Sequence, residues 1–190
     1  MHILDLKKER LITIHKEYMN RLSVVHNEGN QFFIYSNIES PNGRVFSVNL
    51  NNPKKWNDIV PEKENVLSAS FGGGYLFASY LVDAKTEVEQ LDLNGKLIRN
   101  IKLPGIGTAS GFSAKKEDKD LYYSFRSFTF PSTIYNYKLT TGESEIYQSP
   151  SIDFNAEDYI TKQIFFKSKD DTSIPMFITH KKDMAMSGTN

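Results

Sequence analysis

The chain has 190 residues, with 23 basic and 23 acidic side chains, so its formal net charge is zero. This balance gives no electrostatic reason to expect a nucleic acid or an anionic membrane surface as a partner. Cysteine is absent, which excludes disulfides, thiolate nucleophiles and cysteine metal ligands, and no apolar run approaches the roughly 18 residues of a membrane-spanning helix. Aromatic residues make up 13% of the sequence, a content typical of pleated sheets that pack face to face.

A strand-and-turn signature recurs along the chain. Residues 45–50, 88–93 and 134–139 each alternate apolar and polar side chains, end in leucine and lead into a polar stretch. Residues 2–6 are a shortened copy, and the closing leucines of the four copies lie 44, 43 and 46 residues apart. A period of roughly 40 to 50 residues built from short strands is typical of four-stranded propeller blades, which bury their faces on one another.

The predicted elements follow this period in chain order. Residues 1–14 are the remnant of a blade, and because a natural start rarely falls inside a repeat, we expect the sequence to be a piece of a larger protein. Three blades follow at about 21–60, 66–104 and 106–150, each with four strands separated by glycine-, asparagine- or aspartate-rich turns. Helical periodicity is scarce, so the sequence predicts an all-β fold, a partial β-propeller of about three four-stranded blades.

The pattern changes after the third blade. Residues 151–158 are acidic and irregular, and we interpret them as a linker. Residues 159–168 and 173–182 alternate around a polar turn and predict two strands of a hairpin. We assign this hairpin, within 159–190, to the start of the next domain.

The junction carries a family resemblance. Within residues 159–182, Ile174-Pro175-Met176-Phe177-Ile178 is followed by His180-Lys181-Lys182. This segment is very similar to the junction in prolyl oligopeptidases, where the last propeller blade leads into the first hairpin of an α/β-hydrolase domain. Further matches lie in the blades: Ser124, Phe125, Phe128, Pro131, Ile134 and Tyr135 in the third, and Tyr35, Ser36, Asn37, Arg44, Val45, Lys55 and Trp56 in the first. The resemblance covers essentially the whole chain.

The resemblance implies a cytosolic or periplasmic serine peptidase that cuts short peptides after proline. The family's seven-bladed propeller covers the active site and limits access to small peptides, and its serine, histidine and aspartate lie in the hydrolase domain. None of the three maps onto this chain, because it has no G-x-S-x-G motif, and neither Ser110-Gly111 nor Ser187-Gly188 has that spacing. We therefore expect no catalytic residue and no activity in this chain by itself.

Metal and cofactor chemistry is also not expected. The four histidines are scattered and lack metal-ligand spacing: His2, His15, His26 and His180. His180 is interpreted as a surface or packing residue. The Gly72-Gly73-Gly74 run could cradle a phosphate, but neither a helix nor a G-K-[ST] pattern follows it, which favours a turn within a blade.

Acidic and aromatic clusters each have two interpretations. Asp153, Glu157 and Asp158 could form paired carboxylates for acid–base work, but a solvated connector is favoured because no partner is visible. The acidic residues near 118–120 and 170–171 are interpreted as hairpin-turn residues. Five aromatic residues could bind a peptide or a base, but packing within the blades is favoured because no basic strip accompanies them: Tyr122, Tyr123, Phe125, Phe128 and Phe130.

Three functions remain open from the sequence. The chain could be the access-restricting propeller of a prolyl endopeptidase, a stand-alone propeller-type interaction module that shares ancestry with the peptidases, or an enzyme that works as it stands. Three blades and a remnant do not close a ring of seven, so the outer blades are expected to expose apolar faces. We expect the chain to self-associate through those faces.

Overall fold

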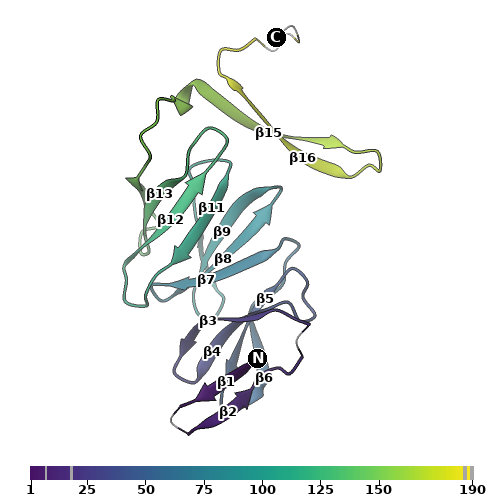
Figure 1. The fold of residues 1–190 in the computed structure, drawn as a ribbon, viewed down its shortest axis with the longest axis vertical. Coiled ribbons are helices and arrows are strands. Elements are labelled where there is room, and N and C mark those ends of the chain that lie inside the picture. Colours follow the sequence, from purple (N-terminus) through teal and green to yellow (C-terminus); the bar gives the residue numbers. More distant parts are fainter. Residues whose placement is uncertain (7, 18, 186–187, 189–190) are drawn as a thin grey trace.

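The computed structural model describes residues 1–6, 8–17, 19–185 and 188. Antiparallel sheets make up almost all of it (Figure 1): three have four strands, and two-stranded hairpins lie before and after them in the sequence. In the described part, the single helical element is a 3-10 turn, η1 (Ala156–Asp158). None of the described helices could cross a membrane. The predicted all-β fold is confirmed.

Each four-stranded sheet is a meander in which strands adjacent in sequence are adjacent in the sheet. Blade 1 comprises β3 (Leu22–Glu28), β4 (Gln31–Ser36), β5 (Arg44–Asn49) and β6 (Asn52–Val60). Blade 2 comprises β7 (Leu67–Gly72), β8 (Tyr75–Val82), β9 (Lys85–Leu91) and β10 (Leu97–Asn100). Blade 3 comprises β11 (Thr108–Ser113), β12 (Asp120–Arg126), β13 (Thr133–Lys138) and β14 (Ser144–Gln148). The three predicted blades are confirmed, and their sheets do not close into a ring.

The hairpin at the start of the chain pairs β1 (His2–Asp5) with β2 (Arg10–Thr13). Because β1 carries the signature that the third strand of each blade carries, this hairpin corresponds to the third and fourth strands of a preceding blade. Its Ile3 and Ile12 side chains join a hydrophobic core with Phe46 of blade 1. The shortened repeat is therefore the outer half of a blade.

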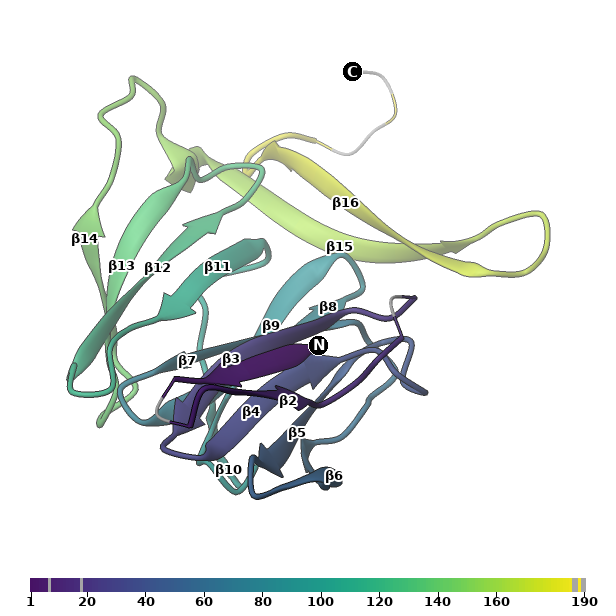
Figure 2. The ribbon, with the colours of Figure 1, turned by 60° about the horizontal axis from the view of Figure 1, so that its bottom comes forward.

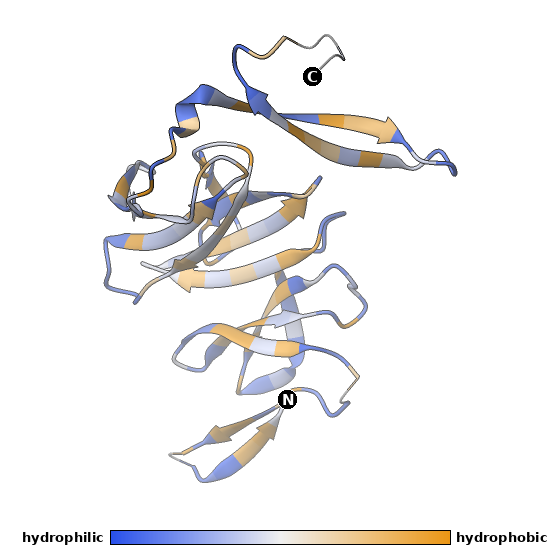
Figure 3. Cartoon of the chain, turned by 45° about the horizontal axis from the view of Figure 1, so that its top comes forward, coloured by the Kyte–Doolittle hydropathy of each residue, from blue (hydrophilic) through white to orange (hydrophobic). Residues whose placement is uncertain are grey.

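The hairpin at the end of the chain pairs β15 (Tyr159–Lys167) with β16 (Ser173–Lys181) in continuous register. In Figure 2 it lies across one end of the blades, and apolar segments run along both of its strands in Figure 3. The predicted hairpin is confirmed, whereas its assignment to a separate domain and the division of the chain at residues 150 and 158 stay predictions.

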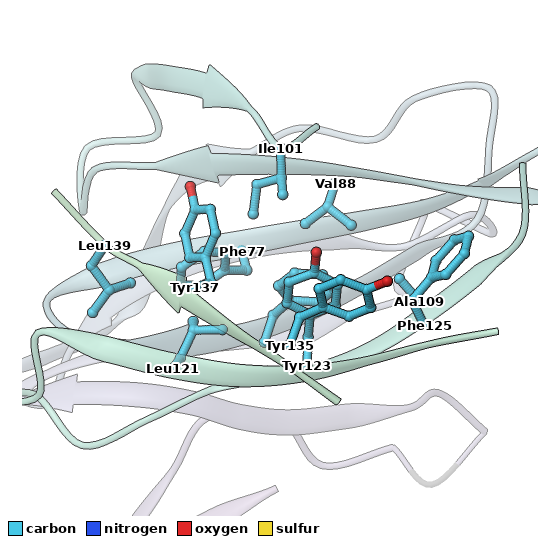
Figure 4. Close-up of a cluster of buried hydrophobic side chains, with 11 residues drawn as sticks. Phe77, Val88, Ile101, Ala109, Leu121, Tyr123, Phe125, Tyr135, Tyr137 and Leu139 are labelled. Atoms are coloured by element: carbon cyan, nitrogen blue, oxygen red, sulfur yellow. The ribbon is translucent and has the colours of Figure 1, made fainter. Parts of the chain in front are cut away.

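The hydrophobic cores lie between sheets. Blades 2 and 3 share the largest of them, in which Phe77 and Val88 of blade 2 meet Leu121, Tyr123 and Tyr137 of blade 3 (Figure 4). A second core joins blades 1 and 2, and a third joins blade 1 to the first hairpin. Each sheet therefore depends on its neighbours for burial, as the repeat period predicts.

The outer turns fit against the preceding blade. Gly95 lies in the turn between β9 and β10 with a φ of +81°, and a Cβ atom there would lie 1.9 Å from the carbonyl oxygen of Ile59 in β6. The close approach and the positive φ both require glycine. The Asn94-Gly95 turn is thus also a contact between blades.

Candidate functional site

The blades converge on their first strands. β3, β7 and β11 are each an edge strand of their own sheet, and β7 lies beside both of the others. The Leu67 N–H donates to the Asn42 carbonyl across the boundary between blades 1 and 2 (2.7 Å), and the Ala114 N–H donates to the Phe71 carbonyl across the next boundary (3.2 Å). This surface of converging edge strands is the candidate site.

A cavity of about 430 Å³ opens between β7 and β11. Its lining comes from blades 2 and 3: Val66, Leu67, Ser68, Ser70, Ser79, Tyr80, Leu81, Thr86, Ala109, Ser110, Gly111 and Phe112. No charged side chain is among them. The cavity therefore offers hydroxyl groups and main-chain atoms at the convergence of the blades.

A polar cluster connects all three blades at the end of the first strands. The imidazole of His26 in blade 1 stacks on the Phe71 ring of blade 2, with centroids 3.4 Å apart and planes 6° apart. Glu28 lies 3.2 Å from the His26 Nε2 and accepts a hydrogen bond from the Lys116 ammonium of blade 3 (2.5 Å). The hydrogen bond from Lys116 and then that from His26 lower the pKa of the Glu28 carboxyl. This cluster holds the three first strands together.

The buried side-chain amide of Gln90 also connects two blades, deeper in the interface between blades 2 and 3. Gln90 is fully buried, its Nε2 donates to the Leu139 carbonyl (3.0 Å), and its Oε1 accepts from the Tyr137 hydroxyl (2.7 Å). Burial raises the pKa of the Tyr137 phenol, which stays a hydrogen-bond donor. Buried polar groups are stable when paired, so this contact fixes how the two blades pack.

The last hairpin contacts loops at one end of blades 2 and 3. The Gln163 side-chain amide donates to the Asp83 carbonyl in the turn between β8 and β9 (2.6 Å). The Phe177 ring lies 5.3 Å from the Phe128 ring, measured between centroids, and both rings border a cavity of about 200 Å³. The hairpin thus covers the loops beside the converging strands.

The histidines do not converge on a common site. The His2 Nδ1 lies 3.0 Å from the Thr13 hydroxyl, His15 packs edge-on to Trp56, and His26 belongs to the cluster described above. The His180 Nδ1 lies 2.7 Å from the carbonyl of the next residue. Across the described ranges, no group of three or more acidic or histidine side chains is placed to hold a metal ion.

The triple glycine and the acidic clusters lie in turns and connectors. Gly73 and Gly74, with φ of +56° and +84°, form the turn between β7 and β8. The connector between blade 3 and the last hairpin contains η1, where Asn155 accepts a hydrogen bond from the Glu157 N–H, and Asp153 and Asp158 are exposed beside it.

The two predicted acidic turns are stabilised locally. The Asp118 carboxylate accepts from the Lys115 N–H (2.8 Å), and Asp120 pairs with the Lys138 ammonium (2.8 Å). Asp170, next to Asp171, accepts hydrogen bonds from the Ser168 hydroxyl and from the residue 172 N–H, which lower its pKa to about 2. Asp118 and Asp170 thus bind within their own turns, as predicted, whereas Asp120 is the first residue of β12 and pairs with Lys138 on the neighbouring strand β13.

The five aromatic candidates have different environments. Tyr123 and Phe125 are buried in the core between blades 2 and 3. Tyr122 is exposed on the open face of blade 3 beside Tyr147, Phe128 contacts the last hairpin, and Phe130 is exposed. Two of the five are therefore packed inside a blade interface.

Of the two serine–glycine pairs weighed from the sequence, the structure describes Ser110-Gly111. The Ser110 hydroxyl lies 3.0 Å from the Ser124 hydroxyl, and no histidine is among its hydrogen-bond partners in the described structure. Ser187 lies outside the described residues. That this chain holds no catalytic residue therefore stays a prediction.

Most residues that shape the site were not singled out from the sequence, and Ser110-Gly111 was considered only as a serine–glycine pair without the spacing of a nucleophile motif. Ser79 and Gly111 border the 430 Å³ cavity, and Gln90 and Gln163 make the contacts between separate units. A comparison of the repeats could have identified Ser79, because the equivalent position in blade 1 holds the much larger Tyr35. Gln163 offers no such signal, since its partner lies 80 residues away.

The fold and the converging edge strands define an open β-propeller, with a hairpin across one end of its blades. Residues 1–150 match the family of prolyl oligopeptidase N-terminal β-propeller domains, and the chain belongs to this family. This match confirms the family resemblance that the blades carry, and it ends before the junction segment at residues 159–182.

Relatives extend well beyond this chain. A prolyl endopeptidase of Elizabethkingia meningoseptica is 43% identical over 145 residues, which cover 75% of this chain and 21% of that protein. A prolyl endopeptidase of Elizabethkingia miricola is 40% identical over 145 residues, with the same coverage of each chain. The chain therefore spans about a fifth of the length of the curated relatives it matches.

Solved structures of related peptidases also match most of this chain, which covers about a quarter of theirs. A prolyl endopeptidase structure, from an analysis of two such enzymes and the role of inter-domain dynamics in their catalysis and specificity, matches with a TM-score of 0.81 and 36% identity. The match covers 93% of this chain and 27% of that one. Apo prolyl oligopeptidase B of Galerina marginata matches with a TM-score of 0.84 at 23% identity, over 93% of this chain and 26% of that one, and shows the fold alone.

Proposed function

We propose that this chain is part of the propeller of a prolyl endopeptidase, a serine peptidase that cuts short peptides after proline. In this proposal the propeller restricts which substrates reach a catalytic domain, and the chain has no peptidase activity by itself. The catalytic serine, histidine and aspartate are supplied by a hydrolase domain to which the last hairpin belongs.

The observation that carries the proposal is the position of β15 and β16 relative to the blades. The hairpin bears the sequence that resembles the junction of the family, and it contacts the loops of blades 2 and 3 through Gln163 and Phe177. A catalytic domain that continues from this hairpin is therefore held over the end of the propeller. Its substrates would have to pass the converging strands or a gap beside them.

The test is cleavage of a fluorogenic peptide with proline before the reporter group. We expect no turnover by the purified 190-residue chain and clear turnover by the protein of the complete open reading frame. The complete protein should also cleave a prolyl bond in a short peptide but leave the same bond intact in a folded protein. Turnover by the 190-residue chain, or a reading frame without a hydrolase domain, would contradict the proposal.

A further inference from the structure

The three blades carry side chains of different size at one equivalent position. This position lies on the second strand of each blade. It is paired with the first residue of the repeat signature on the third strand, and its side chain faces the following blade. Tyr35 occupies it in blade 1, Ser79 in blade 2 and Ser124 in blade 3. Tyr35 packs against the core between blades 1 and 2. The interface between blades 2 and 3 has a serine in place of that ring.

The 430 Å³ cavity lies at this interface and includes Ser79 in its wall. Ligand pockets of roughly 300–1,000 Å³ are typical of proteins, so its size is that of a binding site. Its mouth is bordered by Val66 and Leu81, which are each 57% exposed. The cavity is thus accessible from solvent at an apolar rim.

The serine and threonine hydroxyls of the wall fall into two sets, and that of Ser110, 3.0 Å from the Ser124 hydroxyl, belongs with those already bonded within the protein. Ser70 and Thr86 are committed, because the Ser70 hydroxyl donates to the Phe112 carbonyl (2.5 Å) and the Thr86 hydroxyl accepts from the Ala109 N–H (3.1 Å). These bonds hold the two blades at a fixed separation. Among the described residues, no hydrogen bond to the side chain of Ser68 or Ser79 is present. Ser68 and Ser79 are therefore free to bind a ligand.

The main chain of β11 is also irregular where it borders the cavity. The register between β11 and β12 shifts between Ser110 and Ser113, and Gly111 within this bulge has a φ of +120°. A bulge leaves a residue outside the ladder of its sheet, and such bulges are common beside binding sites. Because β11 is an edge strand, the main-chain groups of Gly111 are not covered by another strand of the sheet, whereas the Phe112 carbonyl in the same bulge accepts from the Ser70 hydroxyl.

We propose that this cavity binds an extended, uncharged peptide segment. The segment adds to the edge of β11 at Gly111, and the hydroxyls of Ser68 and Ser79 bind its main-chain amides. Strand addition satisfies peptide N–H and C=O groups together, and a hydroxyl can donate to one or accept from the other. Ionic side chains are excluded, because the wall has no counter-charge and burial of an unpaired charge is costly. This inference rests on the proposed function in one respect: the bound segment belongs to a peptide substrate.

The experiment titrates the ¹⁵N-labelled 190-residue chain with an uncharged probe, the acetylated and amidated peptide Ala-Gly-Pro-Ala-Gly. We expect amide shifts at Ser68, Ser79 and Gly111. Ser79→Tyr should weaken binding by about tenfold or more without lowering Tm, because the ring fills the cavity as Tyr35 fills the preceding interface. Ser79→Ala keeps the space and removes one hydrogen bond, so it should weaken binding by about threefold to fivefold, less than Ser79→Tyr.

Matched variants keep the result interpretable. Ser173→Tyr makes the same change at an exposed position next to the turn of the last hairpin and should bind like the unchanged chain. If Ser79→Tyr does not fold, Ser68→Phe blocks the cavity from its exposed side and should weaken binding to a similar extent. No shift at Gly111, or equal affinity of the blocked variants and the unchanged chain, would overturn the proposal and leave the cavity as a packing void.

The two proposals fail separately. Cleavage by the complete protein together with unchanged probe binding by Ser79→Tyr would refute the peptide site and leave the peptidase assignment intact. Probe binding that Ser79→Tyr abolishes, in a protein whose full reading frame cleaves no prolyl peptide, would refute the peptidase assignment alone.

Discussion

At the scale of single residues, contacts between blades depend on a few positions with little tolerance. Gln90 reaches two groups of blade 3 from a fully buried position, and Gly95 lets the turn of blade 2 approach the main chain of blade 1. A small substitution at Gln90 or Gly95 is therefore expected to disturb the packing between two blades. Gly74 has nearly the same φ as Gly95, +84° against +81°, but open space around it.

This pair of glycines gives the first prediction. Gly95→Ala is expected to lower the free energy of unfolding by about 2–4 kcal/mol, because it adds a clash with the Ile59 carbonyl to the strain of a positive φ. Gly74→Ala carries the strain alone and is expected to cost about 1–2 kcal/mol. Urea unfolding of both variants measures the difference. Equal losses would show that the Gly95 turn does not press on blade 1.

Among the strands, side-chain contacts between blades hold the first strands of the three sheets together, in addition to the hydrogen bonds within each sheet. Glu28 of β3 receives the Lys116 ammonium from the loop between β11 and β12, and His26 stacks on Phe71 of β7. These contacts span the ends of three sheets. Because Glu28 is at the surface, its contribution is sensitive to pH and to salt.

The second prediction concerns acid. The pKa of Glu28 is lower in the folded chain than in the unfolded chain, so its contribution is present above the unfolded pKa, about 4.3, and is lost as the pH falls through the folded value. Glu28→Gln should therefore show a smaller fall in Tm between pH 7 and pH 3.5 than the unchanged chain. Glu117→Gln, an exposed carboxylate beside Lys116, is the control and should keep the original fall. Identical pH profiles for all three proteins would rule out the contribution of Glu28.

The strands of the three blades could be predicted from the sequence because the signal for each is local. Alternating side chains in residues 45–50 and 88–93, followed by a turn, specify a strand without reference to the rest of the chain. The cavity could not be predicted in this way. Ser79 leaves a space only because the register turns it toward blade 3 and because no large side chain of β11 fills the gap. The contact between Gln163 and Asp83 depends equally on how two distant hairpins are placed.

At the scale of the whole molecule, the series of sheets is open at both ends. Leu4 and Leu11 are 56% and 63% exposed on the outer side of the first hairpin. Tyr122 and Tyr147 are 48% and 62% exposed on the far side of blade 3. Every interface inside the series contains a hydrophobic core, so these apolar end faces have the character of surfaces that another sheet covers.

The third prediction is therefore self-association of the 190-residue chain. Light scattering coupled to gel filtration should give a mass above 21.8 kDa that rises with concentration in the micromolar range. Replacement of Tyr122 and Tyr147 by lysine should reduce the mass toward that of one chain, because it places charge on the apolar face. Met19→Lys, at a residue 93% exposed, is the control and should not change the association. A monomer at all concentrations would contradict the prediction.

The strands, their turns and the period of the blades follow from the amino-acid order alone, because alternation and turn chemistry act over a few neighbouring residues. That order also indicated the family, through the segment at the last hairpin. Which faces meet, where the cavity lies and which side chains connect the blades become apparent only in the folded chain. Those outcomes depend on how twisted sheets pack side by side. Whether a side chain fills or leaves a space, or finds a hydrogen-bond partner, is then set by residues more than forty positions away in the sequence.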